Sequence, residues 1–276
     1  MLPAGETRRR LRRTNESTTA ALTLSRPLVR LFTRYSRGYT TRHFHSLRLL
    51  KTHGVPADFA QLPVAVFFNH AAWWDPLICL ILAQEFFPGR DAFGPIDAAA
   101  LRRYRFLGRL GFFGVARDRS GVAAFLHTAE NILSSRERVL WISPQGAFAD
   151  VRSRPVRLQR GLAHLAARVS PTVFLPLAIE YTFWEERLPE VLVAFGTPLF
   201  TQHHQNSCGI DDWTAAFESG LETAQTALAD AAQRRDADEW RILLHGSSGT
   251  TVIYDAWRRL RSLMRGEQFH KEHSGL

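Results

Sequence analysis

The sequence has few sulfur-containing residues. Of its 276 residues, two are cysteines, Cys79 and Cys208, and two are methionines. Two cysteines so far apart form neither a disulfide framework nor a recognised metal-binding spacing. Cys79 lies in an apolar stretch, which is typical of an inert core residue. The sequence therefore indicates a protein of a reducing compartment.

Long apolar runs are also missing. No run approaches the ~18 residues that a membrane-spanning helix needs. The basic cluster at residues 8–13 precedes a polar stretch, residues 14–19, where a signal peptide would have its apolar core. We find no internal repeat, no Gly-Lys-Ser phosphate loop and no Gly-x-Ser-x-Gly nucleophile motif. The pattern predicts neither a membrane span nor secretion by that route.

The positive charge is concentrated at one end of the chain. Residues 1–60 contain twelve Lys or Arg and three Asp or Glu, a balance of +9 that equals the formal charge of the whole protein. The remaining residues, 61–276, are close to neutral, with enough apolar residues for a sizeable core. A basic segment on a neutral body indicates an anionic partner, either a membrane surface or a nucleic acid.

Three regions follow from these patterns. Residues 1–25 are basic and then rich in Ser and Thr without apolar periodicity, which predicts a disordered N-terminus. Residues 26–60 are predicted to form an amphipathic, membrane-associating helical segment. Residues 61–276 are predicted to form the main domain, with helices at its C-terminal end.

The first helix of the middle region has two contrasting faces. Four arginines fall on one face and five large apolar or aromatic residues on the opposite face: Arg26, Arg30, Arg34 and Arg37, against Leu28, Leu31, Phe32, Tyr35 and Tyr39. Such a helix suits an anionic membrane surface. It equally suits packing of the apolar face on the main domain, with the arginines in water. Nucleic acid is disfavoured, because no binding motif is present and the aromatics lie opposite the arginines.

The main domain alternates between strand and helix patterns. This alternation predicts an α/β fold with a largely parallel central sheet and helices on both faces. The predicted strands are residues 64–68, 112–116, 139–142, 172–179 and 191–195, and the predicted helices are residues 77–82, 98–110, 122–133, 155–168, 211–235 and 250–264.

A candidate catalytic pair lies where the first of these strands meets the following helix. His70 and Asp75 are five residues apart, so that the turn brings the carboxylate to one imidazole nitrogen and leaves the other free to take a proton from a hydroxyl. An alternative is that Asp75, followed by Pro76, is only a helix N-cap.

Other candidate site residues follow neighbouring strands. In parallel sheets, ligands bind at the carboxyl ends of strands, where His70, Arg117 and the turn at residues 144–146 are predicted to converge. An Arg at a strand end suits bidentate contact with a phosphate or carboxylate, although Arg117 could instead pair with Asp118 at the surface. Gly146 is expected to allow a tight turn.

Other aromatic and histidine residues have no clear role from sequence. The neighbouring Trp73 and Trp74 either line a channel for substrate, anchor at an interface or pack beneath the site. The loop with His203, His204 and Cys208 has no recognised ligand spacing, and we predict no metal.

At this point the sequence resembles the 1-acylglycerol-3-phosphate and related lysophospholipid acyltransferases. Their first motif, Asn-His-x4-Asp at a strand end, is matched by Asn69, His70 and Asp75. Their second motif, Gly-x-x-Phe-Ile-x-Arg, is matched by residues 111–117, with Gly114 in place of the aromatic residue.

The third motif of the family departs from its usual form. Where Pro-Glu-Gly-Thr-Arg is usual, Gln145 replaces the Glu, Gly146 is kept, and Phe148 stands where a phosphate-gripping Arg is expected. Residues 160–161 resemble the Lys-Gly that follows, and residues 175–177 match the fourth, proline-containing strand. Arg152, Arg154 or Arg157 could replace the missing arginine.

The resemblance implies transfer of a fatty acyl group from acyl-CoA or acyl-carrier protein to a hydroxyl of a lysophospholipid, such as 1-acylglycerol-3-phosphate. His70 would be the general base and Asp75 would orient it. Five residues would bind substrate: Asn69, Arg117, Gln145, Gly146 and Arg152. No metal or cofactor is expected, since a thioester is already activated. The expected location is peripheral, on the cytoplasmic face of an anionic membrane.

Three alternatives remain at this stage. The altered third motif would suit a glycolipid or another unphosphorylated lipid alcohol as acceptor. The chain could also be a non-catalytic membrane-binding relative, or a hydrolase if water reaches the thioester.

Overall fold

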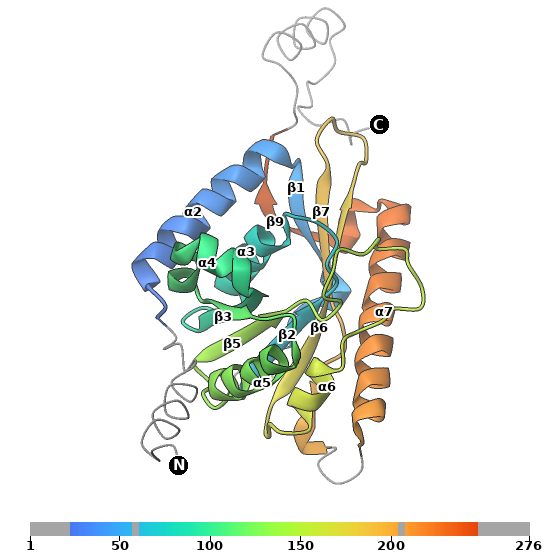
Figure 1. Cartoon of the computed structure of the whole chain (residues 1–276). Coiled ribbons are helices and arrows are strands. Elements are labelled where there is room, and N and C mark those ends of the chain that lie inside the picture. Colours follow the sequence, from blue (N-terminus) through green and yellow to red (C-terminus); the bar gives the residue numbers. More distant parts are fainter. Residues whose placement is uncertain (1–22, 57–60, 204–207, 248–276) are drawn as a thin grey trace, which may run out of the picture.

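The computed structural model describes residues 23–56, 61–203 and 208–247 (Figure 1). Most of the predicted disordered N-terminus and the predicted helix at residues 250–264 lie outside these ranges.

A mixed, mostly parallel sheet of nine strands forms the centre of the molecule. Its order is β4-β3-β5-β2-β6-β7-β1-β9, with β8 paired to β6. The β6–β7, β1–β9 and β6–β8 pairs are antiparallel, and the other pairs are parallel. The strands are β1 (Ser46–Leu50), β2 (Val64–Phe68), β3 (Asp91–Asp97), β4 (Phe112–Val115), β5 (Arg138–Ile142), β6 (Val173–Thr182), β7 (Glu190–Phe195), β8 (Leu199–Phe200) and β9 (Trp240–His245).

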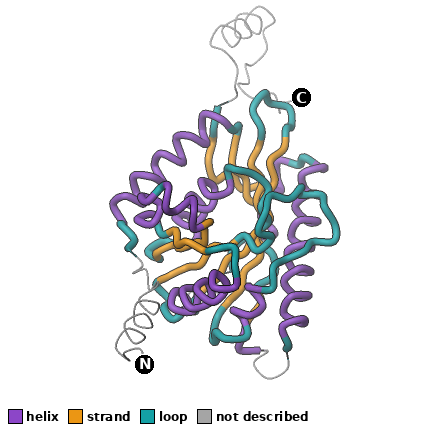
Figure 2. Tube along the Cα trace, in the orientation of Figure 1, coloured by secondary structure: helices purple, strands orange, loops and turns teal. Residues whose placement is uncertain are grey.

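Helices cover both faces of the sheet, which confirms the predicted fold class (Figures 1 and 2). One face carries α2, α3 and α4, and the other carries α5, α6 and α7. Their bounds are α2 (Arg26–His43), α3 (Asp75–Phe86), α4 (Ala98–Arg103), α5 (Arg119–Leu133), α6 (Gly161–Ala166) and α7 (Ile210–Arg234), with 3-10 turns η1 (Lys51–His53), η2 (Arg105–Leu110), η3 (Thr201–His203) and η4 (Ala237–Glu239).

Strand β2 shows why the sequence folds this way. Val64 and Val66 pack with α3 on one face, while Ala65 and Phe67 pack with α5, α6 and α7 on the other. Because both faces are covered, the strand is apolar throughout instead of alternating. A continuous apolar run therefore places β2 in the middle of the sheet and its carboxyl end between the two helical layers.

The middle region was predicted wrongly in part. Residues 46–50 are not part of a helical segment but form β1, a buried strand between β7 and β9. The pattern concealed this strand, because Arg48 interrupts its apolar residues. Arg48 is buried and pairs with Glu190 of β7 at 3.2 Å, and its guanidinium lies 5.0 Å from the Trp184 ring. The main domain therefore begins well before residue 61.

The packing of α2 also differs from the prediction. Its buried stripe is neither the arginine face nor the aromatic face, but the small residues Thr33, Ser36 and Thr40 that lie between them. The hydroxyls of Thr33 and Ser36 donate to carbonyls one turn earlier in the helix, so they are satisfied when they pack beside α3. Leu31 and Tyr35 remain 65% and 54% exposed.

Several elements of the main domain were missed or misjudged. The helix predicted at residues 155–168 is limited to Gly161–Ala166, and the helix predicted at residues 98–110 ends at Arg103 and continues as η2. Strands β3 and β9 were not predicted. β3 contains Gly94 and Pro95, which are uncommon in strands and obscured the pattern.

Candidate active site

His70 and Asp75 form a direct pair at the carboxyl end of β2. The His70 Nδ1 atom lies 2.7 Å from Asp75 Oδ2. The His70 side chain is 26% exposed, whereas Asp75 is fully buried at 0%. Within the described ranges no hydrogen bond involves His70 Nε2, so this nitrogen is available to a ligand. The geometry is that of a base whose tautomer and ring orientation are fixed by a carboxylate.

Asp75 holds the histidine rather than capping the helix. Its Oδ2 also accepts from the Ala72 amide at 3.1 Å, and its Oδ1 accepts from the Tyr181 hydroxyl at 2.7 Å. Helix α3 begins at Asp75 itself, and the preceding Trp74 makes no capping bond through its side chain. The N-cap alternative is therefore wrong, and both carboxylate oxygens are committed to the turn and to β6.

Tyr181 was not identified from sequence. It lies on β6, beside β2, and its side chain reaches the α3 face of the sheet. Burial raises the pKa of Tyr181 well above its usual value, and the nearby Asp75 carboxylate raises it further. The phenol is therefore protonated at neutral pH and acts as a hydrogen-bond donor. Only the register of β6 against β2, which joins residues far apart in sequence, could have revealed this contact.

Asn69, predicted to bind substrate, joins the end of β2 to β6 through its side chain. Its side-chain amide donates to the Ile179 carbonyl at 2.9 Å, and its oxygen accepts from the Ile179 amide at 2.8 Å. The residue is buried. The amide oxygen and one of the two N–H donors of Asn69 are therefore engaged with β6. It fixes the end of β2, and thereby His70, against β6.

The loop after β5, residues 143–154, lies over His70 as expected for a shared site. The His70 amide donates to Gln145 Oε1 at 2.7 Å, and the Ala149 amide donates to the His70 carbonyl at 2.9 Å. Gly146 has a φ of +74°, as the predicted tight turn requires. Gln145 thus anchors the histidine backbone through its side-chain oxygen.

Phe148 occupies the position beside the base where the family motif has an arginine. Its ring centroid lies 4.2 Å from that of His70, and its side chain is largely exposed. The surface next to the base is consequently aromatic and not cationic.

Arg117 does not join the site, contrary to prediction. It follows the edge strand β4, which is separated from β2 by β3 and β5, a distance of about 14 Å at normal strand spacing. Its side chain is 89% exposed and pairs with Asp97 at 2.9 Å. Asp118, its suggested partner, instead caps α5 by accepting from the Gly121 amide.

Arg152 lies on the loop after β5, but it also does not contact the dyad. Its guanidinium forms a bidentate pair with Asp150, at 2.9 and 2.7 Å. It lines a cleft on the other face of the sheet, which is described below.

Aromatic side chains form a continuous row beside the dyad. Trp74 contacts Tyr39, His43 and Phe44 of the N-terminal segment, while Trp73 is exposed next to it. Successive ring contacts of 5 to 7 Å define this aromatic row: Phe106, Phe32, Tyr35, Tyr39, Trp74 and Trp73. The row connects the exposed side of α2 with the turn that carries His70.

Cys79 lies in α3 as a buried core residue, as predicted, and burial raises the pKa of its thiol. Among the described residues, no three His, Cys, Asp or Glu side chains gather as a metal site would require. His204 of the candidate loop lies outside those residues. In the same part of the chain, no helix combines the length and apolar character that crossing a membrane demands.

No protein-family model matches the chain, and a search of curated proteins finds no significant match. The resemblance to lysophospholipid acyltransferases thus depends on the motifs alone.

Proposed function

We propose that this protein is an O-acyltransferase that moves a fatty acyl group from a thioester to a hydroxyl of a lysophospholipid. One observation carries the proposal: a partly exposed imidazole is oriented by a fully buried carboxylate 2.7 Å away, at the carboxyl end of a central parallel strand. The motif order along the chain and the aromatic surface beside the dyad support the same function.

The reaction requires one base and no covalent enzyme intermediate. His70 Nε2 takes the proton of the acceptor hydroxyl while the hydroxyl oxygen attacks the thioester carbonyl carbon. The carbon–oxygen bond forms, the carbon–sulfur bond breaks, and the imidazolium returns the proton to the leaving thiolate. Asp75 stabilises the imidazolium, and Tyr181 and the Ala72 amide hold Asp75 in place.

Membrane attachment through α2 belongs to this proposal. The exposed Leu31 and Tyr35 of α2, together with the exposed Trp73, would enter the interface of an anionic membrane. Arg30 and Arg34 are exposed on the same helix and would contact lipid phosphates. The aromatic row then extends from the bilayer surface to the turn that carries His70, and an acyl chain would pass along it from the membrane to the base.

A second candidate keeps the chemistry and replaces the acceptor by an unphosphorylated lipid alcohol, such as a glycolipid. Phe148 beside His70 favours it, because an aromatic ring packs on a sugar or acyl chain and cannot neutralise a phosphate. Phe148→Arg is then expected to shift preference toward phosphorylated acceptors.

The decisive experiment measures acyl transfer by the purified protein from acyl-CoA and from acyl-carrier protein. The acceptors are lysophosphatidate, lysophosphatidylcholine, a glycolipid and none. His70→Ala should abolish transfer, whereas the matched variant His127→Ala, which removes an exposed histidine of α5, should not. Full activity of His70→Ala would remove the dyad from the mechanism.

Product analysis separates the alternatives. Free fatty acid without acceptor-dependent product would make the protein a thioester hydrolase. Product from the glycolipid alone would support the second candidate. Vesicle binding with no turnover of any thioester would contradict catalysis and favour a non-catalytic relative.

A further inference from the structure

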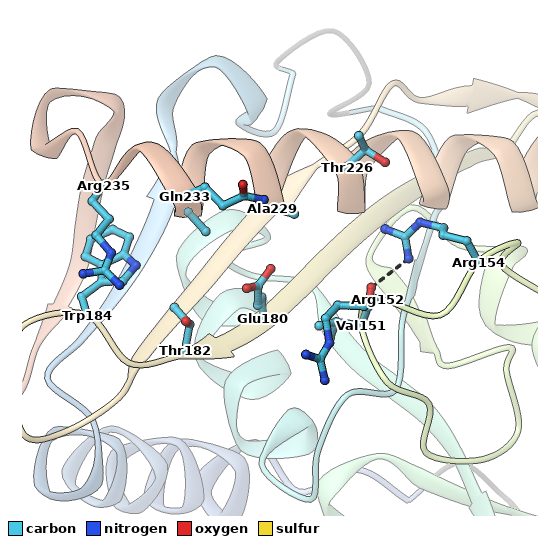
Figure 3. A pocket seen from close by; sticks show the side chains of 11 residues that line it. Val151, Arg152, Arg154, Glu180, Thr182, Trp184, Thr226, Ala229, Gln233 and Arg235 are labelled. Atoms are coloured by element: carbon cyan, nitrogen blue, oxygen red, sulfur yellow. Dashed lines mark hydrogen bonds between the residues drawn. The ribbon is translucent and has the colours of Figure 1, made fainter.

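A polar cleft of about 700 Å³ lies on the face of the sheet opposite the dyad. Successive side chains of a strand point to opposite faces, so Tyr181 reaches Asp75 while its neighbours Glu180 and Thr182 face α7. Figure 3 shows these two residues along the floor, α7 along one side, and Val151, Arg152 and Arg154 at one end. These three residues belong to the loop that covers His70.

Arginines stand at both ends of this cleft. Figure 3 shows Arg152 and Arg154 toward one end and Arg235, beside Trp184, at the other. Arg235 ends α7 in the left-handed conformation, with a φ of 54°, and within the described ranges its side chain forms no ion pair. With Glu180 as the one acidic lining residue, the lining carries a net positive charge.

The floor and the α7 side of the cleft provide hydrogen-bonding groups between the arginines. Thr182, Thr226 and Gln233 line the cleft, and Glu180 lies among them. Burial raises the pKa of Glu180, while Arg152 and Arg154 oppose that effect. No ion pair to Glu180 forms in the part of the chain that the structure describes. A ligand hydroxyl would therefore find an acceptor there, between two cationic ends.

The distance between the cleft and His70 means that a ligand occupying both must be long. A chain that runs from His70 to Glu180 must cross the sheet edge, a distance on the order of 10 Å. The phosphate of a lysophosphatidate is attached to the carbon next to the one that carries the reacting hydroxyl, so it must stay close to His70. The phosphates of a coenzyme A thioester lie at the far end of a pantetheine arm, which spans such a distance.

We propose that this cleft binds the phosphate-bearing end of the thioester donor, with phosphates at the arginine ends and hydroxyl groups on the floor. The inference builds on the proposed acyl transfer and assigns the donor side of the site. Arg152 accordingly serves the donor and not the acceptor head group.

Binding is tested by calorimetry with coenzyme A, 3′-dephospho-coenzyme A and glycerol 3-phosphate, at low salt and without turnover. The variant Arg152→Gln/Arg235→Gln removes one charge at each end, and Arg168→Gln removes an exposed arginine that pairs with Glu130 elsewhere. Each charge-assisted contact contributes roughly tenfold in affinity. We expect coenzyme A to bind at least tenfold more weakly to the double variant and unchanged to Arg168→Gln.

Loss of the 3′-phosphate from the ligand should also weaken binding to the wild type. Coenzyme A binding that is equal in wild type and double variant would overturn the proposal, as would the absence of binding. Glycerol 3-phosphate binding that depends on Arg152 and Arg235, without coenzyme A binding, would overturn the donor assignment in favour of the acceptor.

The outcome for the cleft is separable from that for the reaction. Cleft-dependent coenzyme A binding without acyl transfer would contradict the proposed function and leave the cleft assignment intact. Acyl transfer by a protein whose affinity for coenzyme A is unchanged by the cleft substitutions would support the proposed function and contradict the cleft assignment. Circular dichroism of each variant establishes that it is folded.

Discussion

The Tyr181 hydroxyl donates a 2.7 Å hydrogen bond to Oδ1 of Asp75, the carboxylate oxygen that does not contact His70. The hydrogen bond withdraws charge from the carboxylate and fixes its plane. It connects the base to β6, so the dyad is supported from a strand as well as from its own turn. Tyr181 is therefore a positioning residue for the proposed reaction.

Replacing Tyr181 by Phe removes this bond and leaves the ring. We expect kcat to fall about tenfold with little change in KM, because one buried hydrogen bond to a charged group is lost. The exposed Tyr104→Phe serves as control. A kcat of Tyr181→Phe equal to that of the wild type, or a loss confined to KM, would contradict a positioning role.

Asn69→Ala should act on stability. It leaves the amide and carbonyl of Ile179 without their partners in the core, which should cost about 2 to 4 kcal/mol in the free energy of unfolding. Urea denaturation measures the loss. Asn131→Ala, which removes an exposed contact to Arg138, should change stability by less than about 0.5 kcal/mol. A similarly small effect at Asn69 would show that the clamp is dispensable.

Glu180→Gln should stabilise the protein at neutral pH. Burial raises the pKa of Glu180 above its unfolded value near 4.5, so the folded state binds the proton more tightly. The wild type therefore loses stability as the pH rises from below that value through the raised pKa. The Tm advantage of Glu180→Gln should be seen at pH 7 and be smaller at pH 4. An advantage that does not depend on pH would show that the cause is not ionisation.

The exposed side of α2 should govern membrane binding. Leu31→Ser with Tyr35→Ser should weaken binding to vesicles containing anionic lipid by about tenfold or more, since two partly inserted side chains are lost. Arg30→Glu with Arg34→Glu should weaken binding in a salt-dependent way. The matched change Thr41→Ala, at a half-buried position of α2, should have little effect. Unchanged vesicle binding by the first two variants would make α2 purely structural.

The dyad could be predicted because it is local: a strand, a turn and a helix start within a few residues place His70 beside Asp75. Gln145 and Gly146 were predicted to lie near His70 because each follows a strand of a parallel sheet at its carboxyl end, and β5 does pair with β2. Arg117 was misplaced because a sequence does not show that β4 is at the sheet edge. Tyr181 and the engaged amide of Asn69 depend on strand register, which is a long-range property.

Strand β1 constrains the order in which the sheet can form during synthesis. It pairs with β7 on one side and with β9 on the other, and among the described residues β9 has no other partner strand. During synthesis, residues 46–50 leave the ribosome long before their partners, because β7 follows almost 150 residues and β9 almost 200 residues later in the chain. β1 cannot pair until those strands have emerged. Deleting residues 1–60 would therefore remove β1, the strand with which β9 pairs. The role of α2 is best examined by point substitution.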